Sequence, residues 1–361
     1  MSRDELLSIL NEDRKKFFTI EDISKDEIKL SLLKKIDKVF NKGLDFYLDF
    51  SPIDIPKSSK VFFRKKNFHN TLSIEDKRIV DSFESLKSLL DGYRNLTETS
   101  NHTYPYKGTA KIEDNPKSVA LKTRNVFIPK KNIKEDKEFL KGIIAKLAEI
   151  NVYVFEFVET WNKKDRATID GVYIEPNVIV LKRQKYYKRE IFTLAHEIGH
   201  YLLGIEDIEA VDMTFHNQSH AINKIEKWCN DFAFYLIVGD RASELERLTN
   251  YSEEANQIID ELTKYTHISK LSCYTKLANK GIIGFPFYKK IIKDIEDYEE
   301  KERELKKVEI KDINSNPRTP KPIISPLYLE TMQLAFYNGL VSEAVFRERL
   351  KIPENLIDKY L

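Results

Sequence analysis

The chain has few cysteines, no long apolar run and almost no net charge, and each shortage excludes a class of protein. The two cysteines among 361 residues, Cys229 and Cys273, cannot supply the disulfide framework of a secreted protein. The apolar runs are too short to span a bilayer. The segment MSRDELLSILNEDRKK is too acidic and polar for a signal peptide. A formal net charge of +2 creates no global field toward nucleic acid or an anionic membrane. We therefore expect a soluble, cytoplasmic protein with no membrane partner.

What the chain does have is enough apolar material for more than one core. Hydrophobic residues make up 41% of it, which suits two or three domains. Residues 96–118 are rich in Thr, Asn, Pro and Gly, which makes them a candidate domain boundary. We predict three parts. They are a helical N-terminal region with an extended basic and aromatic connector (1–118), a central domain (119–290), and a charged helix, Pro-rich linker and small helical unit (291–361).

The two flanking parts show mainly helical patterns. Residues 1–44 place Leu, Ile and Phe at helical spacing and predict two short helices, and 74–93 predict another. Between them, residues 45–70 hold prolines, aromatics and a basic patch and are expected to be extended. Residues 287–312 predict a charged, solvated helix. Near the C-terminus, LAFYNGLVSEAVFRERLKI predicts a helix–turn–helix-like hairpin.

The central domain mixes helices with strands. Residues 135–151 predict an amphipathic helix, and VYVFEFV (152–158) alternates like a strand. TIDGVYI and NVIVLKR, separated by Glu175-Pro176, predict two more strands. The segment YYKREIFTLAHEIGHYLLG predicts a helix that ends at Gly204, and a further helix is predicted at 222–238 after a loop. This order of elements indicates an α+β fold.

The helix that contains AHEIGH carries the strongest chemical motif. His196 and His200 are four residues apart, which is about 400° of helical rotation, so both imidazoles leave the same face about one turn apart. Neutral imidazoles in this geometry can chelate one zinc ion. Glu197 stands beside them, where it can take a proton from the water that a catalytic zinc activates. Gly199 is interpreted as leaving space beside the ion. Burying such polar groups among FTLA and YLLG without partners would cost several kcal/mol.

A catalytic zinc needs a third protein ligand. The metzincin pattern would require a histidine where Glu206 stands and a glycine where Leu203 stands, so that pattern fails. Glu226 lies at the margin of the apolar stripe of helix 222–238, and we prefer it as the third ligand. The alternative is that Glu226 is an exposed partner of a neighbouring lysine. Three carboxylates of the intervening loop remain competitors: Glu206, Asp207 and Glu209.

Further residues near the motif are candidates for supporting roles. Asn230 follows Glu226 by four residues and can hydrogen-bond to a metal ligand. Hydrolysis of an amide also needs a donor for the tetrahedral oxyanion. Four side chains lie near enough in sequence to be candidates for it: Tyr201, His216, His220 and Tyr235.

FTLAHEIGH followed by IEKWCNDFAFYLI resembles the ImmA/IrrE family of zinc metallopeptidases. Its members pair an FTLAHELGH helix with a later E-x-x-A-N-x-F-A helix. Here Cys229 stands where the family usually has alanine, Ile237-Val238-Gly239 replaces a Leu-Met-Pro-like segment, and Lys276 replaces an arginine further on. The likeness covers about residues 126–290. The connector LDFYLDF…VFFRKK is similar to the one that follows an Xre-type DNA-binding unit in longer members, but residues 1–44 are too short for that unit.

The resemblance implies a minimal zinc-metallopeptidase core at residues 119–290, in which a small, mostly antiparallel sheet accompanies the HExxH helix and a Glu-bearing helix. It also implies that His196, His200 and Glu226 hold one catalytic Zn²⁺ and that Glu197 is the general base. Family members are cytoplasmic peptidases that cleave a partner repressor or antitoxin of the Xre type. We therefore expect a zinc-dependent endopeptidase that acts on a helix–turn–helix repressor or antitoxin in stress-response, mobile-element or phage-defence regulation.

Two other classes of function stay open at this stage. One is a non-catalytic zinc-containing regulator, although a purely structural site has no need of the base Glu197. The other is a nucleic-acid-binding module built on the basic and aromatic segment KVFFRKKNFHN (60–70), which can also serve as a regulatory contact. The sequence leaves the oligomeric state, the substrate and the activating signal open.

Overall fold

The structure of the chain is a computed structural model. It describes residues 3–11, 17–25, 27–40, 47, 74–99, 103–130, 133–158, 167–184, 186–206, 208–210, 220–295, 297 and 321–361. Two compact units are present, Met1–Ser85 and Leu86–Leu361. The division into three parts stays a prediction. None of the helices within these described ranges is long and apolar enough to cross a membrane.

Within the described residues of 1–44, the structure has three short helices where the sequence predicted two. They are α1 (Arg3–Asn11), α2 (Ile20–Ser24) and α3 (Leu30–Phe40). Helix α2 begins after Thr19, whose backbone N–H donates to Asp22 Oδ2 at 3.0 Å, and this local bond favours the additional helix. Leu10, Leu32 and Ile36 form the small core of the unit. Apart from Tyr47, the predicted connector 45–70 lies outside the described residues, and so does the basic segment 60–70.

The helix predicted at 74–93 is observed as α6 (Ile74–Leu96). The second unit then contains the remaining elements in an α+β order, as predicted. They are α7 (Pro116–Phe127), α8 (Asp136–Glu149), β1 (Tyr153–Phe157), β2 (Ile169–Ile174), β3 (Val178–Lys182), α9 (Tyr187–Leu203), β4 (Ile208–Ala210), α10 (His220–Val238), η3 (Gly239–Arg241), α11 (Ala242–Glu246), α12 (Glu253–Tyr265), α13 (Lys270–Asn279), α15 (Pro326–Tyr337), α16 (Glu343–Leu350) and η4 (Glu354–Lys359).

The described strands form one sheet in the order β1-β3-β2-β4. Strands β1 and β3 are parallel, with Tyr153 opposite Val178, whereas β2 pairs antiparallel with both β3 and β4. The sheet is therefore mostly antiparallel, as expected. Most side chains of β1, β2 and β3 are buried. This explains their near-continuous apolar sequences, since a strand that is covered on both faces needs no polar alternation.

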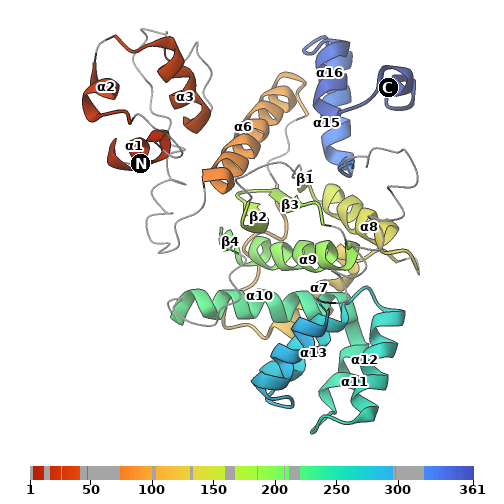
Figure 1. Cartoon of the computed structure of the whole chain (residues 1–361). Coiled ribbons are helices and arrows are strands. Elements are labelled where there is room, and N and C mark those ends of the chain that lie inside the picture. The colour runs from red at the N-terminus through yellow and green to blue at the C-terminus, as the bar shows by residue number, and fades with distance from the viewer. Residues whose placement is uncertain are drawn as a thin grey trace, which may run out of the picture. The chain divides into compact units, whose positions relative to one another are not determined.

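Helix α9 lies between the sheet and helix α10 (Figure 1). Its side chains Leu194, Ile198 and Leu202 are fully buried in the main core. The helix ends as predicted at Gly204, which adopts a φ of 63° in the left-handed region. Because α9 is covered on both sides, its polar residues are buried together with its apolar ones.

A buried cluster of one arginine and two glutamates anchors the start of α9. Arg183, which follows β3, pairs with Glu190 on the first turn of the helix, and its guanidinium also lies 3.9 Å from Glu156 of β1. Burial and then the neighbouring Glu156 raise the pKa of Glu190 to about 9. The backbone N–H of Ile323 donates to Glu156 at 2.8 Å. The same cluster therefore joins the sheet, α9 and the segment that leads into α15.

Hydrogen bonds fix helix α10 at Trp228, near its middle, and at its C-terminal end. It begins at His220, two residues before the predicted start. The indole N–H of Trp228 donates to the backbone carbonyl of Asp114 at 2.8 Å. At the far end, the Arg124 guanidinium of α7 donates to the carbonyls of Leu236 and Ile237, which have no partner within an α-helix. These contacts fix the face that α10 turns toward α9.

The C-terminal elements match the predicted hairpin. Helices α15 and α16 pack against each other, and Gly339 in the connecting turn adopts a φ of 71°. Helix α15 also contacts β1 and α8, where the Tyr153 hydroxyl lies 2.9 Å from Thr331 Oγ1. Of the charged helix predicted at 287–312, residues 287–295 and 297 are described and are helical.

Candidate metal centre

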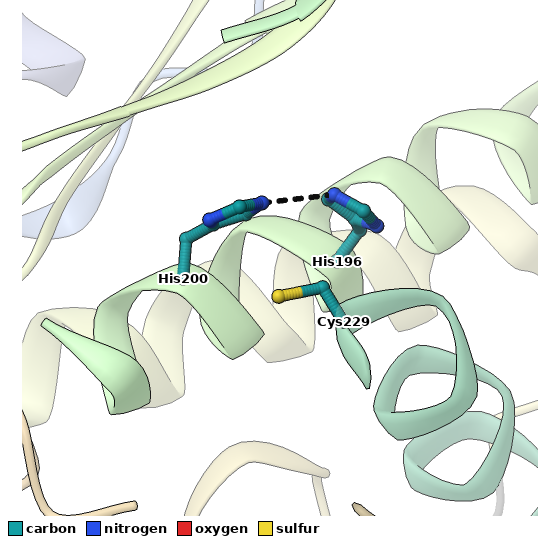
Figure 2. Close-up of side chains that lie close together, drawn as sticks. All are labelled: His196, His200 and Cys229. Atoms are coloured by element: carbon teal, nitrogen blue, oxygen red, sulfur yellow. Dashed lines mark hydrogen bonds between the residues drawn. The ribbon is translucent and has the colours of Figure 1, made fainter. Parts of the chain in front are cut away.

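Helix α9 places the three residues of the HExxH motif in the interior of the second unit. His196, Glu197 and His200 are 0%, 1% and 1% exposed. The Nε2 atoms of the two imidazoles lie 3.1 Å apart. Figure 2 shows the two rings facing each other along the helix, as the four-residue spacing predicts. Two nitrogen donors thus converge on one point.

Glu226 of α10 approaches both imidazoles. Its Oε2 lies 3.2 Å from His196 Nε2, and its Oε1 lies 3.4 Å from His200 Nε2. Ligands arranged tetrahedrally at about 2.0–2.1 Å from zinc are roughly 3.3 Å from one another. The separations among the three groups are thus close to the edges of a zinc-coordination tetrahedron. The donor set, two imidazoles and one carboxylate, is also one that zinc favours.

The charge state of Glu226 agrees with this arrangement. Burial alone would raise its pKa, but the imidazoles of His196 and His200 outweigh burial and hold the pKa well below its usual range. Glu226 is therefore present as a carboxylate, with oxygens able to donate electron pairs to a cation.

Asn230 lies one turn beyond Glu226 and contacts the rear of the first imidazole. Its Oδ1 is 3.1 Å from His196 Nδ1. An amide oxygen only accepts hydrogen bonds, so Nδ1 carries the proton in this contact. In the neutral form of His196, a proton on Nδ1 leaves the lone pair on Nε2, on the side of the other donors. Such contacts behind a metal ligand fix its tautomer and the orientation of its ring.

Cys229 is a further potential donor that the sequence reasoning did not select. One donor atom from each of His196, His200 and Cys229 lies within 4.8 Å of the others, and Figure 2 shows the thiol beside the two rings. The carboxylate oxygens of Glu226 lie at 3.2 and 3.4 Å from the two imidazoles. These separations fit a tetrahedral site better than a cluster whose donor atoms are only known to lie within 4.8 Å of one another. The signal in the sequence was the position of Cys229, three residues after Glu226 and hence on the same helical face.

The structure assigns a different role to Gly199 from the one interpreted from sequence. A Cβ atom there would lie 3.1 Å from Cys229 Sγ and 3.3 Å from its Cα. The space beside Gly199 is thus filled by α10 itself. The glycine lets the two helices approach closely, and this approach brings Glu226 to the imidazoles.

The four candidates for the oxyanion donor have different environments. The ring of Tyr201 is buried against Tyr173, and burial raises the pKa of Tyr201 to about 12. The Tyr235 hydroxyl donates to Glu246 at 2.8 Å. His220 is the first residue of α10, although its side chain is outside the described part, as is all of His216.

The competing carboxylates of the loop after α9 are also placed only in part. Glu206 accepts the backbone N–H of Glu175 at 2.6 Å, so it contacts the β2–β3 turn. Asp207 and the side chain of Glu209 lie outside the described residues.

A small sheet, an HExxH helix and a second helix that brings a glutamate to the two histidines together define the class of HExxH metallopeptidases. Residues 147–277 match the family model Peptidase_M78, described as the IrrE N-terminal-like domain. This match confirms the resemblance to the ImmA/IrrE family for this part of the chain. The match lies within the range of about 126–290 inferred from the motifs. A comparison with curated proteins found no match.

Proposed function

We propose that the chain is a zinc-dependent endopeptidase that cleaves a specific cytoplasmic protein. The observation that carries this proposal is the convergence of His196, His200 and Glu226, with separations of 3.1, 3.2 and 3.4 Å among their donor groups. Beside them stands Glu197, a residue that a structural metal site does not need. Its presence supports an enzyme over a zinc-containing regulator.

The three side chains suit the metal that we propose. His196 and His200 would hold Zn²⁺ through Nε2, and Glu226 through its carboxylate. The chemistry that bound zinc supplies is Lewis acidity, which lowers the pKa of water toward about 7 and polarises a substrate carbonyl. Three protein ligands leave one position of a tetrahedron for water or substrate, as in catalytic sites.

Glu197 would transfer the proton. As a carboxylate it accepts the proton of the attacking water, and as a carboxylic acid it then donates that proton to the departing amine. It lies next to His196 in the sequence, so helix α9 fixes both the metal ligand and the base. Asn230 would keep the His196 ring in the required tautomer.

Replacement of Asn230 by alanine is expected to lower zinc affinity by about 10–100-fold, since loss of an outer hydrogen bond to a ligand has effects of this size. The measurement is competition with a chromophoric chelator. Asn230→Asp is the matched control, because it keeps an acceptor oxygen for Nδ1 and should retain most of the affinity. Equal losses in both variants would show that the contact does not act through this hydrogen bond.

The substrate class that we propose is a small helix–turn–helix repressor or antitoxin of the Xre type. The family match supports a protein substrate, and the likeness to ImmA/IrrE supports this particular kind. Cleavage would relieve repression of stress-response, mobile-element or phage-defence genes.

The experiment is to incubate the full chain, loaded with zinc, with a helix–turn–helix repressor encoded beside its gene. Intact-mass analysis should show two fragments that fail to form with chelator and form again when zinc is restored. If the repressor stays whole while unfolded casein is cut, the chain is a peptidase of another specificity. If neither protein is cut, the proposed activity is wrong.

A further inference from the structure

The face of β2 that α9 covers contains one residue without a side chain. Gly171 and Tyr173 lie on this face, because residues two apart in a regularly paired strand point to the same side. On α9, Thr193, Glu197 and Tyr201 follow one another at intervals of four. The aromatic rings of Tyr173 and Tyr201 meet with centroids 5.8 Å apart. Gly171 therefore faces Thr193 and Glu197.

At this point the strand and the helix are too close for any side chain on β2. A Cβ atom at residue 171 would lie 2.8 Å from Glu197 Oε1, 3.2 Å from Glu197 Cγ and 2.5 Å from Thr193 Cγ2. All three distances are shorter than a normal contact or at its limit. The carboxylate of the base thus lies directly against the backbone of β2, in space that only glycine leaves open.

Neither partner can easily move away. Gly171 is paired with Leu181 of β3, and β2 is held on its other side by β4. The Thr193 hydroxyl donates to the carbonyl of Arg189 at 3.1 Å, which fixes the rotamer that directs its methyl group to the strand. Glu197 lies in the stretch 193–203 of α9, in which every residue is buried.

The strand is also irregular where it passes Glu197. The pairing of β2 with β4 shifts register between Ile169 and Val172, so one extra residue is accommodated on β2 around Gly171. A bulge of this kind bends a strand and re-aims its backbone, and bulges are frequent beside active sites. Close approach at Gly171 and irregular pairing between Ile169 and Val172 are two separate observations on the same short stretch of β2.

We infer that Gly171 is a positioning residue for Glu197. The absent side chain provides the space for the carboxylate, and the backbone of β2 limits where that carboxylate can stand. This inference rests on the proposed role of Glu197 as general base. The new element is that Gly171, which lies on β2 and on neither of the two helices, controls the position of the Glu197 carboxylate relative to the attacking water and the substrate.

The test is made on the Co²⁺-substituted full chain with acetohydroxamate as the probe, so no substrate is needed. A hydroxamate binds such a metal and gives its proton to the neighbouring base, so its affinity reports on Glu197. Gly171→Ala should weaken acetohydroxamate binding by about 10-fold or more, as expected for a lost hydrogen bond to a charged group. The visible spectrum of bound Co²⁺ before the probe is added should stay unchanged, because the metal ligands do not move.

A double-mutant cycle with Glu197→Gln decides whether the effect passes through the base. If it does, Gly171→Ala should cause little further loss in the Glu197→Gln background, since residues that act as one unit are not additive. Equal losses in both backgrounds would overturn the inference. Absence of Co²⁺ binding by the unmodified chain would instead contradict the metal centre itself, and so the proposed function.

Thr193→Ser is the matched control for packing, because it removes the methyl group that would clash at 2.5 Å and keeps the hydroxyl. The inference expects Gly171→Ala/Thr193→Ser to remain defective in acetohydroxamate binding. Full recovery in that double variant would assign the defect to crowding at Thr193 and reject the role for Glu197. If Gly171→Ala does not fold, the same cycle is measured in the Thr193→Ser background.

Discussion

Glu197→Gln is expected to keep about one Zn²⁺ per chain while its rate of repressor cleavage falls by about 10²–10⁴-fold, the usual contribution of a general acid or base. Glutamine has nearly the same shape as glutamate but cannot accept a proton at neutral pH. The buried site next to Gly171 should therefore accommodate it, and His196, His200 and Glu226 should still hold the metal. Zinc is measured by elemental analysis and cleavage by the appearance of fragments.

Glu149→Gln is the matched control for this change of charge, since Glu149 lies on α8 with its side chain 61% exposed. It should match the original chain in both measurements. An unchanged cleavage rate in Glu197→Gln would refute the assignment of the base. A loss of zinc in that variant would mean that Glu197 is itself a ligand, which contradicts the proposed arrangement.

Glu226→Ala is expected to lose most of its metal, with affinity lowered by more than the roughly 100-fold that marks the loss of an outer hydrogen bond. The variant removes one of three donor groups and also the carboxylate charge next to two buried imidazoles. Their other close donor would be the thiol of Cys229, within the looser 4.8 Å cluster. Metal content after gel filtration and chelator competition measure the effect.

Cys229→Ala separates the two potential third ligands, because both residues stand on the same face of α10. It should retain its zinc, and the alanine should fit beside Gly199, where the thiol now lies. The reverse result, with metal kept in Glu226→Ala and lost in Cys229→Ala, would transfer the ligand role to the thiol. Metal retained in both variants would move the third ligand to the carboxylates of the loop after α9.

Local features of the site were predictable because short-range geometry fixes them. The spacing of His196 and His200 on a helix requires that their imidazoles meet, and they do so with 3.1 Å between the Nε2 atoms. The end of α9 at Gly204 follows from the tolerance of glycine for the left-handed region. The apolar runs of the strands and the alternation of elements likewise indicated an α+β fold, which is confirmed.

Contacts between elements were less predictable, since they depend on how the helices and strands pack. Glu226 was chosen because it borders an apolar stripe, but only the crossing of α9 and α10 shows that both of its oxygens reach the histidines. The same crossing gives Gly199 its role and adds Cys229 to the cluster. A third helix within residues 1–44 was missed because only short-range bonds between Thr19 and Asp22 favour it.

The sequence by itself determined which groups we propose for the chemistry, since residue type and helical spacing specify two imidazoles, a nearby carboxylate and their common face. It also indicated the family that the motifs resemble, and the family model matches residues 147–277. Only the tertiary structure decided which side chains and backbone segments surround these groups. The distance of Glu226 from the imidazoles, the contact of Asn230 and the place of Glu197 against Gly171 all depend on close packing between elements that are distant along the chain.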